Sequence, residues 1–175
     1  FSIVDKWGNA VSNTYTLNTA FGSGIIPFGT GILMNNEMDD FSSKPGFPNA
    51  YGLVGSEANK IEPRKTPLSS MSPVIVFHDD KPFLITGSPG GSTIITSVLQ
   101  EILNVLDFQM SLEESSEKSR IHFQHLPDIL FYEKLDNRLI KNLEKDKKLV
   151  KRKLGEIHSI LLKKDGIEAF SDKRR

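Results

Sequence analysis

Short hydrophobic runs alternate with turn-forming residues at both ends of the chain. The runs 74–77 and 83–86 are continuously apolar and flank His78-Asp79-Asp80-Lys81, which predicts a β-hairpin covered on both faces. Asp165-Gly166 marks the turn of a second hairpin near the C-terminus. In chain order, the strands predicted by such runs are 1–5, 10–17, 31–34, 74–77, 83–86, 157–162 and 167–170.

A helical period replaces these runs in the middle of the chain. Apolar residues recur at i, i+4 and i+8 over residues 93–106, which predicts a helix. They form an apolar stripe two residues wide along one side of this helix, and we expect the stripe to pack on a sheet. Ser111 followed by Glu114 is a capping-box signature and predicts a second helix over 111–118. Residues 138–149 favour a third helix. Strands at both ends with helices between them indicate an α+β fold with layered packing.

The chain of 175 residues is long enough for one domain with its own core, so a single domain, 1–175, is expected. Within it, residues 42–66 are rich in Ser, Pro, Gly and Asn and predict a long surface loop. Loops of this length inside compact domains often act as lids or binding loops.

Composition excludes several classes of function. The chain has no cysteine, so disulfides, thiol catalysis and thiolate zinc sites are excluded. No apolar run has the length of a membrane span. The 13 basic and 6 acidic residues from Arg138 onward give this end a charge of +7, but its lysines alternate with acidic and apolar residues. That pattern is typical of a solvated helix face, so nucleic-acid binding is not expected.

Two segments gather hydrogen-bond donors on stiff backbone. Pro67–Pro73 brackets Ser69 and Ser70 between prolines, and Gly87–Ser92 is a glycine-rich turn from a strand to a helix. Such a turn exposes backbone N–H groups at a helix start, which is an anion-binding arrangement. Hydroxyls and N–H groups suit a carboxylate and a developing oxyanion. The P-loop lysine is missing, so nucleotide binding is not expected.

These segments belong to a series of motifs that resembles the small subunit of the γ-glutamyltranspeptidase (glutathione hydrolase) family. The motifs are Thr14–Asn18, Asn35–Phe41, Lys44–Gly46, Pro67–Pro73, Gly87–Ser92 and Arg120–Pro127. The resemblance implies an N-terminal nucleophile hydrolase fold, a four-layer αββα sandwich completed by a large subunit from the same precursor. It also implies periplasmic or secreted localisation and no metal or cofactor.

The implied substrates are glutathione and other γ-glutamyl compounds, whose glutamyl end carries an ammonium and a carboxylate. Asn18, Glu37 and Asp40 resemble the family's ammonium clamp, since all three side chains offer acceptors to the N–H donors. Ser69 and Ser70 resemble the hydroxyl donors to the α-carboxylate. An arginine for the same carboxylate comes from the large subunit in this family.

The implied reaction passes through a γ-glutamyl-threonine intermediate, which water or an amino acid or peptide acceptor then releases. The family's nucleophile is an N-terminal threonine just before the residue that matches Phe1, and its own amine is the base. Thr16 resembles the second threonine, whose hydroxyl bonds to that nucleophile, and Gly90 and Gly91 resemble the oxyanion hole. Tyr51 resembles a lid tyrosine.

Some positions depart from the family pattern and leave alternatives open. Thr66 stands where the family usually has an arginine, and His125 stands where it has a tryptophan. Residues 146–148 replace a glycine-histidine turn, and Lys173 replaces a proline. Because the first residue is Phe1, a processed product or a truncated non-catalytic fragment is expected. A related acylase or a capsule depolymerase on the same scaffold is a further alternative, although it should change the ammonium clamp.

Overall fold

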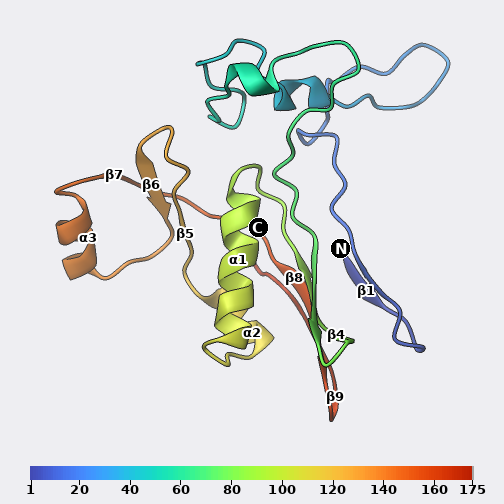
Figure 1. Cartoon of the computed structure of the whole chain (residues 1–175), viewed down its shortest axis with the longest axis vertical. Helices are drawn as coiled ribbons and strands as arrows, with labels where there is room; N and C mark the ends of the chain where they lie inside the picture. The colour runs from blue at the N-terminus through green and yellow to red at the C-terminus, as the bar shows by residue number, and fades with distance from the viewer. Residues whose placement is uncertain (175) are drawn as a thin grey trace. The chain divides into compact units, whose positions relative to one another are not determined.

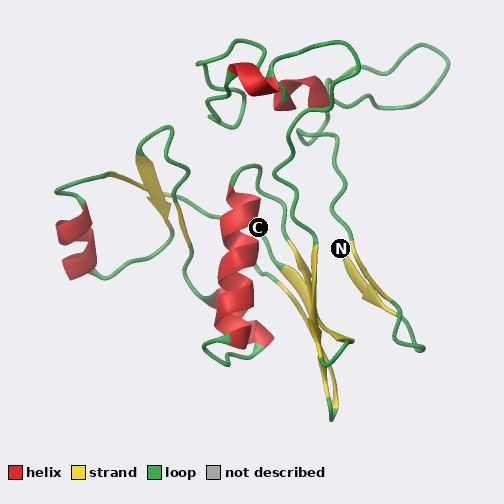
Figure 2. Ribbon diagram, in the orientation of Figure 1, coloured by secondary structure: helices red, strands yellow, loops and turns green. Residues whose placement is uncertain are grey.

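The structure is a computed structural model that describes residues 1–174, and the chain divides into two compact units. Unit 1 comprises Phe1–Thr14 together with the chain from Ser70 onward, and unit 2 comprises Tyr15–Ser69. Unit 1 contains the helices and paired strands, whereas unit 2 is largely loop with short helical turns (Figures 1 and 2).

The main sheet of unit 1 confirms both predicted hairpins. It has the order β3 (Val74–His78), β4 (Lys81–Gly87), β8 (His158–Lys163) and β9 (Gly166–Ser171), and every neighbouring pair is antiparallel. The end of β4 is fully buried, but β3 is only partly covered and its Phe77 is 59% exposed. The prediction that both faces of these strands are buried is therefore confirmed for the end of β4 and is wrong for β3 in this chain.

A small ribbon at the N-terminus pairs β1 (Ser2–Val4) with β2 (Ala10–Ser12). The prediction of a strand over 10–17 was too long, because the ladder ends at Ser12. The ribbon is fixed to the main sheet by side chains: the Ser12 hydroxyl donates to the Thr86 carbonyl at 2.7 Å. The start of the chain therefore lies beside the two central strands of the sheet.

Helix α1 (Thr93–Leu106) and helix α2 (Leu112–Glu117) form as predicted. The capping box of α2 is complete, with the Glu114 N–H bonded to the Ser111 hydroxyl at 3.2 Å and the Ser111 N–H bonded to the Glu114 carboxylate at 3.0 Å. Only one edge of the apolar stripe on α1 packs on the sheet. Among the described residues, no helix is long and apolar enough to cross a membrane.

The prediction of a third helix over residues 138–149 was wrong for the second half of this range. Helix α3 (Asn137–Leu143) ends early, and β7 (Lys148–Lys151) pairs in parallel with β6 (Ile129–Tyr132). The short strand β5 (Ile121–His122) completes this second sheet on the other side of β6. The residues of β7 gain a ladder of backbone hydrogen bonds from a strand distant in sequence, and this gain outweighs the local helical pattern.

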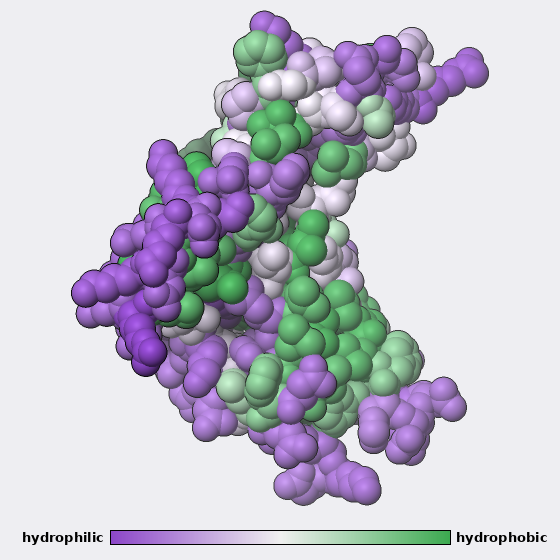
Figure 3. Space-filling view, turned by 60° about the vertical axis from the view of Figure 1, so that its left-hand side comes forward, coloured by the Kyte–Doolittle hydropathy of each residue, from purple (hydrophilic) through white to green (hydrophobic). Residues whose placement is uncertain are grey.

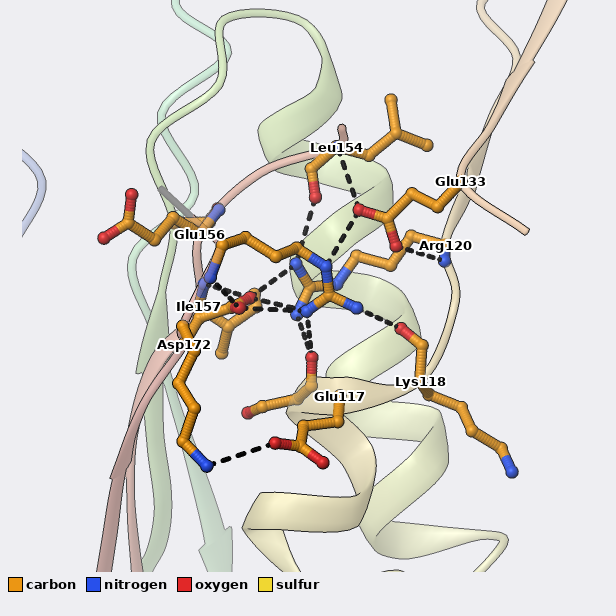
Figure 4. A network of polar contacts seen from close by, with 12 residues as sticks. Glu117, Lys118, Arg120, Glu133, Leu154, Glu156, Ile157 and Asp172 are labelled. Atoms are coloured by element: carbon orange, nitrogen blue, oxygen red, sulfur yellow. Dashed lines mark hydrogen bonds and ion pairs between the residues drawn. The ribbon is translucent and has the colours of Figure 1, made fainter. Parts of the chain in front are cut away.

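A buried ion network holds the C-terminal segment of unit 1 (Figure 4). Arg120 and Asp172 form an ion pair of 2.8 Å with 3% and 2% of their side chains exposed. Arg174 bonds to the same Asp172 carboxylate at 2.8 Å and to Glu133 at 2.9 Å. A cavity of about 590 Å³ lies beside this network, and no residue of the expected site lines it.

Unit 2 contains the helical turns η1 (Glu37–Asp40) and η2 (Glu57–Asn59). The strand predicted at 31–34 is absent. The Met34 backbone does pair with Ile25 and Ser23, but Met34 and Ile32, which would share one face of a strand, are 43% and 62% exposed, so that face is not buried. The predicted loop 42–66 is confirmed as largely non-repetitive structure.

Candidate functional site

Two carboxyl groups face the same side of the turn η1 in unit 2. Glu37 and Asp40 are three residues apart, a spacing that stacks side chains in a 3₁₀ turn. The Asn35 carboxamide fixes the start of the turn by accepting the Glu37 N–H at 3.0 Å. Burial raises the pKa of both carboxyl groups, and for Glu37 the hydrogen-bond contact and negative charge of Asp40 raise the pKa further.

One oxygen of this pair lacks a partner. Glu37 Oε1 is buried and has no hydrogen bond among the described residues. A buried acceptor without a donor costs free energy, and two neighbouring carboxylates repel each other. A ligand with several N–H donors and a positive charge would remove both costs, so the pair is suited to a cationic amine.

Asn18 lies at the centre of a hydrogen-bond network that reaches the residue before η1. Its N–H bonds to the Thr16 hydroxyl at 2.8 Å, and its side-chain Nδ2 donates to the Asn36 carbonyl at 3.2 Å. Because Asn36 directly precedes η1, this contact fixes Asn18 to the turn. Tyr51 donates its phenolic proton to the Asn18 carbonyl at 2.5 Å. Burial, then the negative charges of Asp40 and Glu37, raise the pKa of Tyr51.

Unit 2 therefore brings together the second threonine, the clamp residues and the lid tyrosine that the family resemblance implies. They are Thr16, Asn18, Glu37, Asp40 and Tyr51. A cavity of about 210 Å³ lies between η1 and the loop, with Asp39 and Asp40 on one side and Ala50 and Leu53 on the other. The loop 42–66 thus closes against the turn that carries the carboxyl pair.

Two asparagines that hold this arrangement were not predicted from the sequence. Asn59 donates to the Asp40 carbonyl at 2.7 Å and accepts the Leu68 N–H at 3.0 Å, one residue before Ser69. Asn49 donates to the Asp39 carbonyl at 3.3 Å. Asparagine in a loop rich in Ser, Pro and Gly looks like an ordinary turn residue, so only the folded structure identifies these contacts.

The glycine turn before α1 lies in unit 1. Gly90 has φ +137° and Gly91 has φ +57°, backbone conformations that favour glycine. A Cβ at Gly90 would lie 2.5 Å from the Thr93 hydroxyl, which itself donates to the Gly90 carbonyl at 2.8 Å. No described residue accepts a hydrogen bond from the N–H of either glycine. Two adjacent backbone donors are therefore available to an anion at the helix start.

The expected serine pair lies where the two units join in sequence, since Ser69 ends unit 2 and Ser70 begins unit 1. Ser69 is exposed and Ser70 is half-buried. The Ser70 carbonyl accepts the Ser72 hydroxyl at 3.1 Å, which stiffens the segment between the two prolines.

No group of three or more metal-ligating side chains occurs within residues 1–174. His122 is buried, and both of its ring nitrogens are engaged, with Thr96 at 2.8 Å and with Gln124 at 2.8 Å. Burial lowers the pKa of His122, so the ring is a neutral part of the core.

Comparisons with known proteins agree with one another. The protein-family model for gamma-glutamyltranspeptidase matches residues 1–175. The chain is 52% identical over 169 residues to the glutathione hydrolase proenzyme of Escherichia coli strain K12, covering 95% of this chain and 29% of that protein. The chain therefore spans less than a third of that relative's length.

Solved structures give the same result. A mutant of gamma-glutamyltranspeptidase from Helicobacter pylori is 49% identical, with a TM-score of 0.94 over 100% of this chain and 98% of that chain. The transpeptidase enzyme CapD of Bacillus anthracis is 22% identical, with a TM-score of 0.74 over 99% of this chain and 93% of that chain. The second match concerns the fold alone.

Proposed function

The chain belongs to the gamma-glutamyltranspeptidase family, and we propose that it is the small subunit of an enzyme acting on γ-glutamyl compounds. The enzyme would hydrolyse glutathione and related compounds and transfer the γ-glutamyl group to amino acid or peptide acceptors. The observation that carries this proposal is the unpaired buried oxygen of Glu37 beside Asp40, within reach of the Asn18 and Tyr51 network.

The carboxyl pair would bind the α-ammonium of the substrate. An ammonium has three N–H donors, and Glu37, Asp40 and the carboxamide oxygen of Asn18 supply three acceptors. Asn18 gives an Nδ2 proton to Asn36, which leaves its Oδ1 for the ligand. Burial is the main cause of the raised pKa of Glu37, and the cation would offset the further contribution from the negative charge of Asp40. Charge and hydrogen bonding therefore favour the same ligand group.

The other groups would bind the substrate's negative charges. The hydroxyls of Ser69 and Ser70 would donate to the α-carboxylate.

A threonine directly before Phe1 would attack the γ-carbonyl, with its own α-amine as base. The N–H groups of Gly90 and Gly91 would stabilise the oxyanion that develops. Thr16 accepts the Asn18 N–H and keeps its own proton for a bond to the nucleophile.

One edge of the apolar stripe on α1 is exposed to solvent, which supports the presence of a partner chain. Ile95 and Leu99 are 52% and 51% exposed, and Leu103 and Leu106 continue the same edge. Figure 3 shows a broad hydrophobic area on the molecular surface. Apolar patches of this kind are unfavourable in water and typical of interfaces. We propose that the large subunit covers this edge.

In this arrangement, the chain is one domain, 1–175, of a processed heterodimer. The large subunit completes a four-layer αββα sandwich of the N-terminal nucleophile hydrolase type, and the loop 42–66 acts as a lid that carries Tyr51. The enzyme would need no metal or cofactor and would act in the periplasm or outside the cell.

The test is the release of aniline from a γ-glutamyl anilide. The complete protein that contains this chain should release it, and the chain 1–175 alone should not, because it carries neither the threonine nor the large subunit. Turnover by the chain alone would contradict the assigned roles. A folded, processed complete protein with no turnover would contradict the proposed activity.

A further inference from the structure

Ser88 lies directly before the glycine turn of unit 1 and is buried, with 3% of the residue exposed. Its hydroxyl donates to the Pro89 carbonyl at 2.7 Å and accepts the Glu156 N–H at 2.9 Å. Glu156 belongs to the segment that leads into β8. The hydroxyl of Ser88 therefore connects the glycine turn to a second part of the chain.

The carbonyl that Ser88 holds belongs to the same peptide group as the Gly90 N–H. Because a trans peptide group is planar, its C=O and N–H bonds point in opposite directions. A hydrogen bond that fixes the Pro89 carbonyl therefore also fixes the direction of the Gly90 N–H. This N–H is one of the two donors assigned above to the proposed oxyanion hole.

The glycines of the turn do not fix this direction by themselves. Glycine adopts positive φ about as readily as negative φ, so the backbone of Gly90 and Gly91 permits more than one orientation of each peptide group. The peptide group between the two glycines has its own restraint. The N–H and the hydroxyl of Thr93 donate to the Gly90 carbonyl at 3.2 Å and 2.8 Å. The peptide group before Gly90 depends on Ser88 instead.

The main sheet and the segment before β8 hold Ser88 in place. The ladder between β4 and β8 ends at the pair of Gly87 and His158. The bond between Glu156 and Ser88 joins the same two segments just beyond that end. Gly155 packs closely against the serine, since a Cβ on Gly155 would lie 2.7 Å from Ser88 Oγ. Regular backbone elements therefore set the position of the hydroxyl, which is how a positioning group is made rigid.

We propose that Ser88 is a positioning residue for the oxyanion hole, and that its hydroxyl holds the Pro89–Gly90 peptide group with the Gly90 N–H directed at the developing oxyanion. This inference rests on the proposed function, because it assigns a role in the same reaction. Ser88 acts through the peptide group and not by contact with the substrate. Donors that are oriented before the reaction stabilise the transition state most, so a donor without this restraint contributes less.

The first experiment measures kcat and KM of the complete protein for a γ-glutamyl anilide. Ser88→Ala removes the bond to the Pro89 carbonyl, and Ser97→Ala is the matched control. Ser97 is a buried serine of α1 that lies against the same glycine, 2.6 Å from the position of a Cβ on Gly155. Its hydroxyl has no hydrogen-bond partner among the described residues, so its removal leaves the turn unchanged.

We expect Ser88→Ala to lower kcat at least about tenfold, and by less than the roughly 10²–10³-fold cost of losing an oxyanion donor outright. KM should be unchanged, because the lost interaction acts in the transition state. Formation and release of the γ-glutamyl intermediate both pass through an oxyanion, so kcat falls whichever step is slower. Ser88→Cys retains a weak donor and should have an intermediate kcat. Ser97→Ala should keep wild-type kinetics.

These outcomes separate the inference from the proposed function. A wild-type protein without turnover contradicts the proposed function. An active wild-type protein together with a folded Ser88→Ala variant that has the kcat of Ser97→Ala overturns the role of Ser88 alone. A lower melting temperature with an unchanged kcat for the folded variant would show that Ser88 only stabilises the fold. If Ser88→Ala does not fold, a Ser88→Cys protein with wild-type kcat would overturn the inference.

A second measurement does not depend on turnover. A crystal structure of the complete protein with Ser88→Ala should show the Pro89–Gly90 peptide group rotated or in two orientations. The same peptide group should keep its wild-type orientation in Ser97→Ala. An unchanged peptide group in Ser88→Ala would refute the inference, whatever the activity of the wild-type protein.

Discussion

Tyr51 donates a hydrogen bond of 2.5 Å to the backbone carbonyl of Asn18, a residue 33 positions earlier in the chain. This bond joins the long loop 42–66 to the segment that carries Thr16. The Asn18 N–H is in turn bonded to the Thr16 hydroxyl at 2.8 Å. A single side chain of the loop therefore positions two residues of the proposed site through the backbone.

Tyr51→Phe should weaken substrate binding in the complete enzyme, because the loop loses its bond to Asn18. A neutral hydrogen bond contributes about 0.5–1.5 kcal/mol, so kcat/KM for a γ-glutamyl anilide should fall roughly 2–10-fold, mainly through a higher KM. Tyr132→Phe in β6 removes a phenolic hydroxyl outside the proposed site and should leave both constants unchanged. Equal kinetics for the wild type and Tyr51→Phe would argue against a lid role.

Asp40→Ala should leave the substrate ammonium with an incomplete clamp. A charge-assisted hydrogen bond contributes about 1.5–3 kcal/mol, so kcat/KM should fall by at least about tenfold. Asp107→Ala, which removes an exposed carboxylate at the end of α1, is the control and should keep wild-type kinetics. Unchanged kinetics in a folded Asp40→Ala enzyme would indicate that Asp40 is only a solvated turn residue.

The double variant Ser69→Ala/Ser70→Ala tests the proposed α-carboxylate site. It should slow a substrate that carries this carboxylate and leave a matched substrate without it unaffected, so the preference between the two should collapse. A purely structural serine pair would slow both substrates equally and lower the melting temperature. Measuring kcat/KM for both substrates together with a melting curve separates the two cases.

Gly90→Ala should damage the proposed oxyanion hole. Its Cβ would lie 2.5 Å from the Thr93 hydroxyl at a φ of +137°, so the turn must shift and misplace its N–H donors. Loss of one such donor typically costs about 10²–10³ in kcat. Gly8→Ala is the control, since Gly8 also has a positive φ of +88° but has no atom within 4 Å of the added Cβ. A Gly90→Ala enzyme with a kcat near that of Gly8→Ala would contradict the assignment.

Local signals in the sequence predicted much of unit 1. Both hairpins and α1 follow from apolar runs, turn residues and a helical period, each complete within a few residues. The segment 148–151 could not be assigned in this way, because its lysines and apolar residues suit a helix face as well as a strand. Its conformation depends on parallel pairing with β6, and such pairing leaves no local signal.

For the candidate site, the sequence predicted which residues take part but not the hydrogen bonds between them. The carboxylates Glu37 and Asp40 were expected from their motif, and the structure places them beside Asn18 and Tyr51. The contacts of Asn59 were not expected, because a loop asparagine can bond to many backbone groups and only folding selects one.

The most direct test of the account compares a γ-glutamyl anilide with glutaryl anilide, which lacks only the α-amino group. The complete protein should cleave the γ-glutamyl compound with a kcat/KM at least about tenfold higher, because only this substrate supplies the ammonium that Glu37 and Asp40 can bind. Asp40→Ala should reduce that ratio toward one. Equal or better cleavage of glutaryl anilide by the wild-type protein would contradict the ammonium clamp and favour a related acylase.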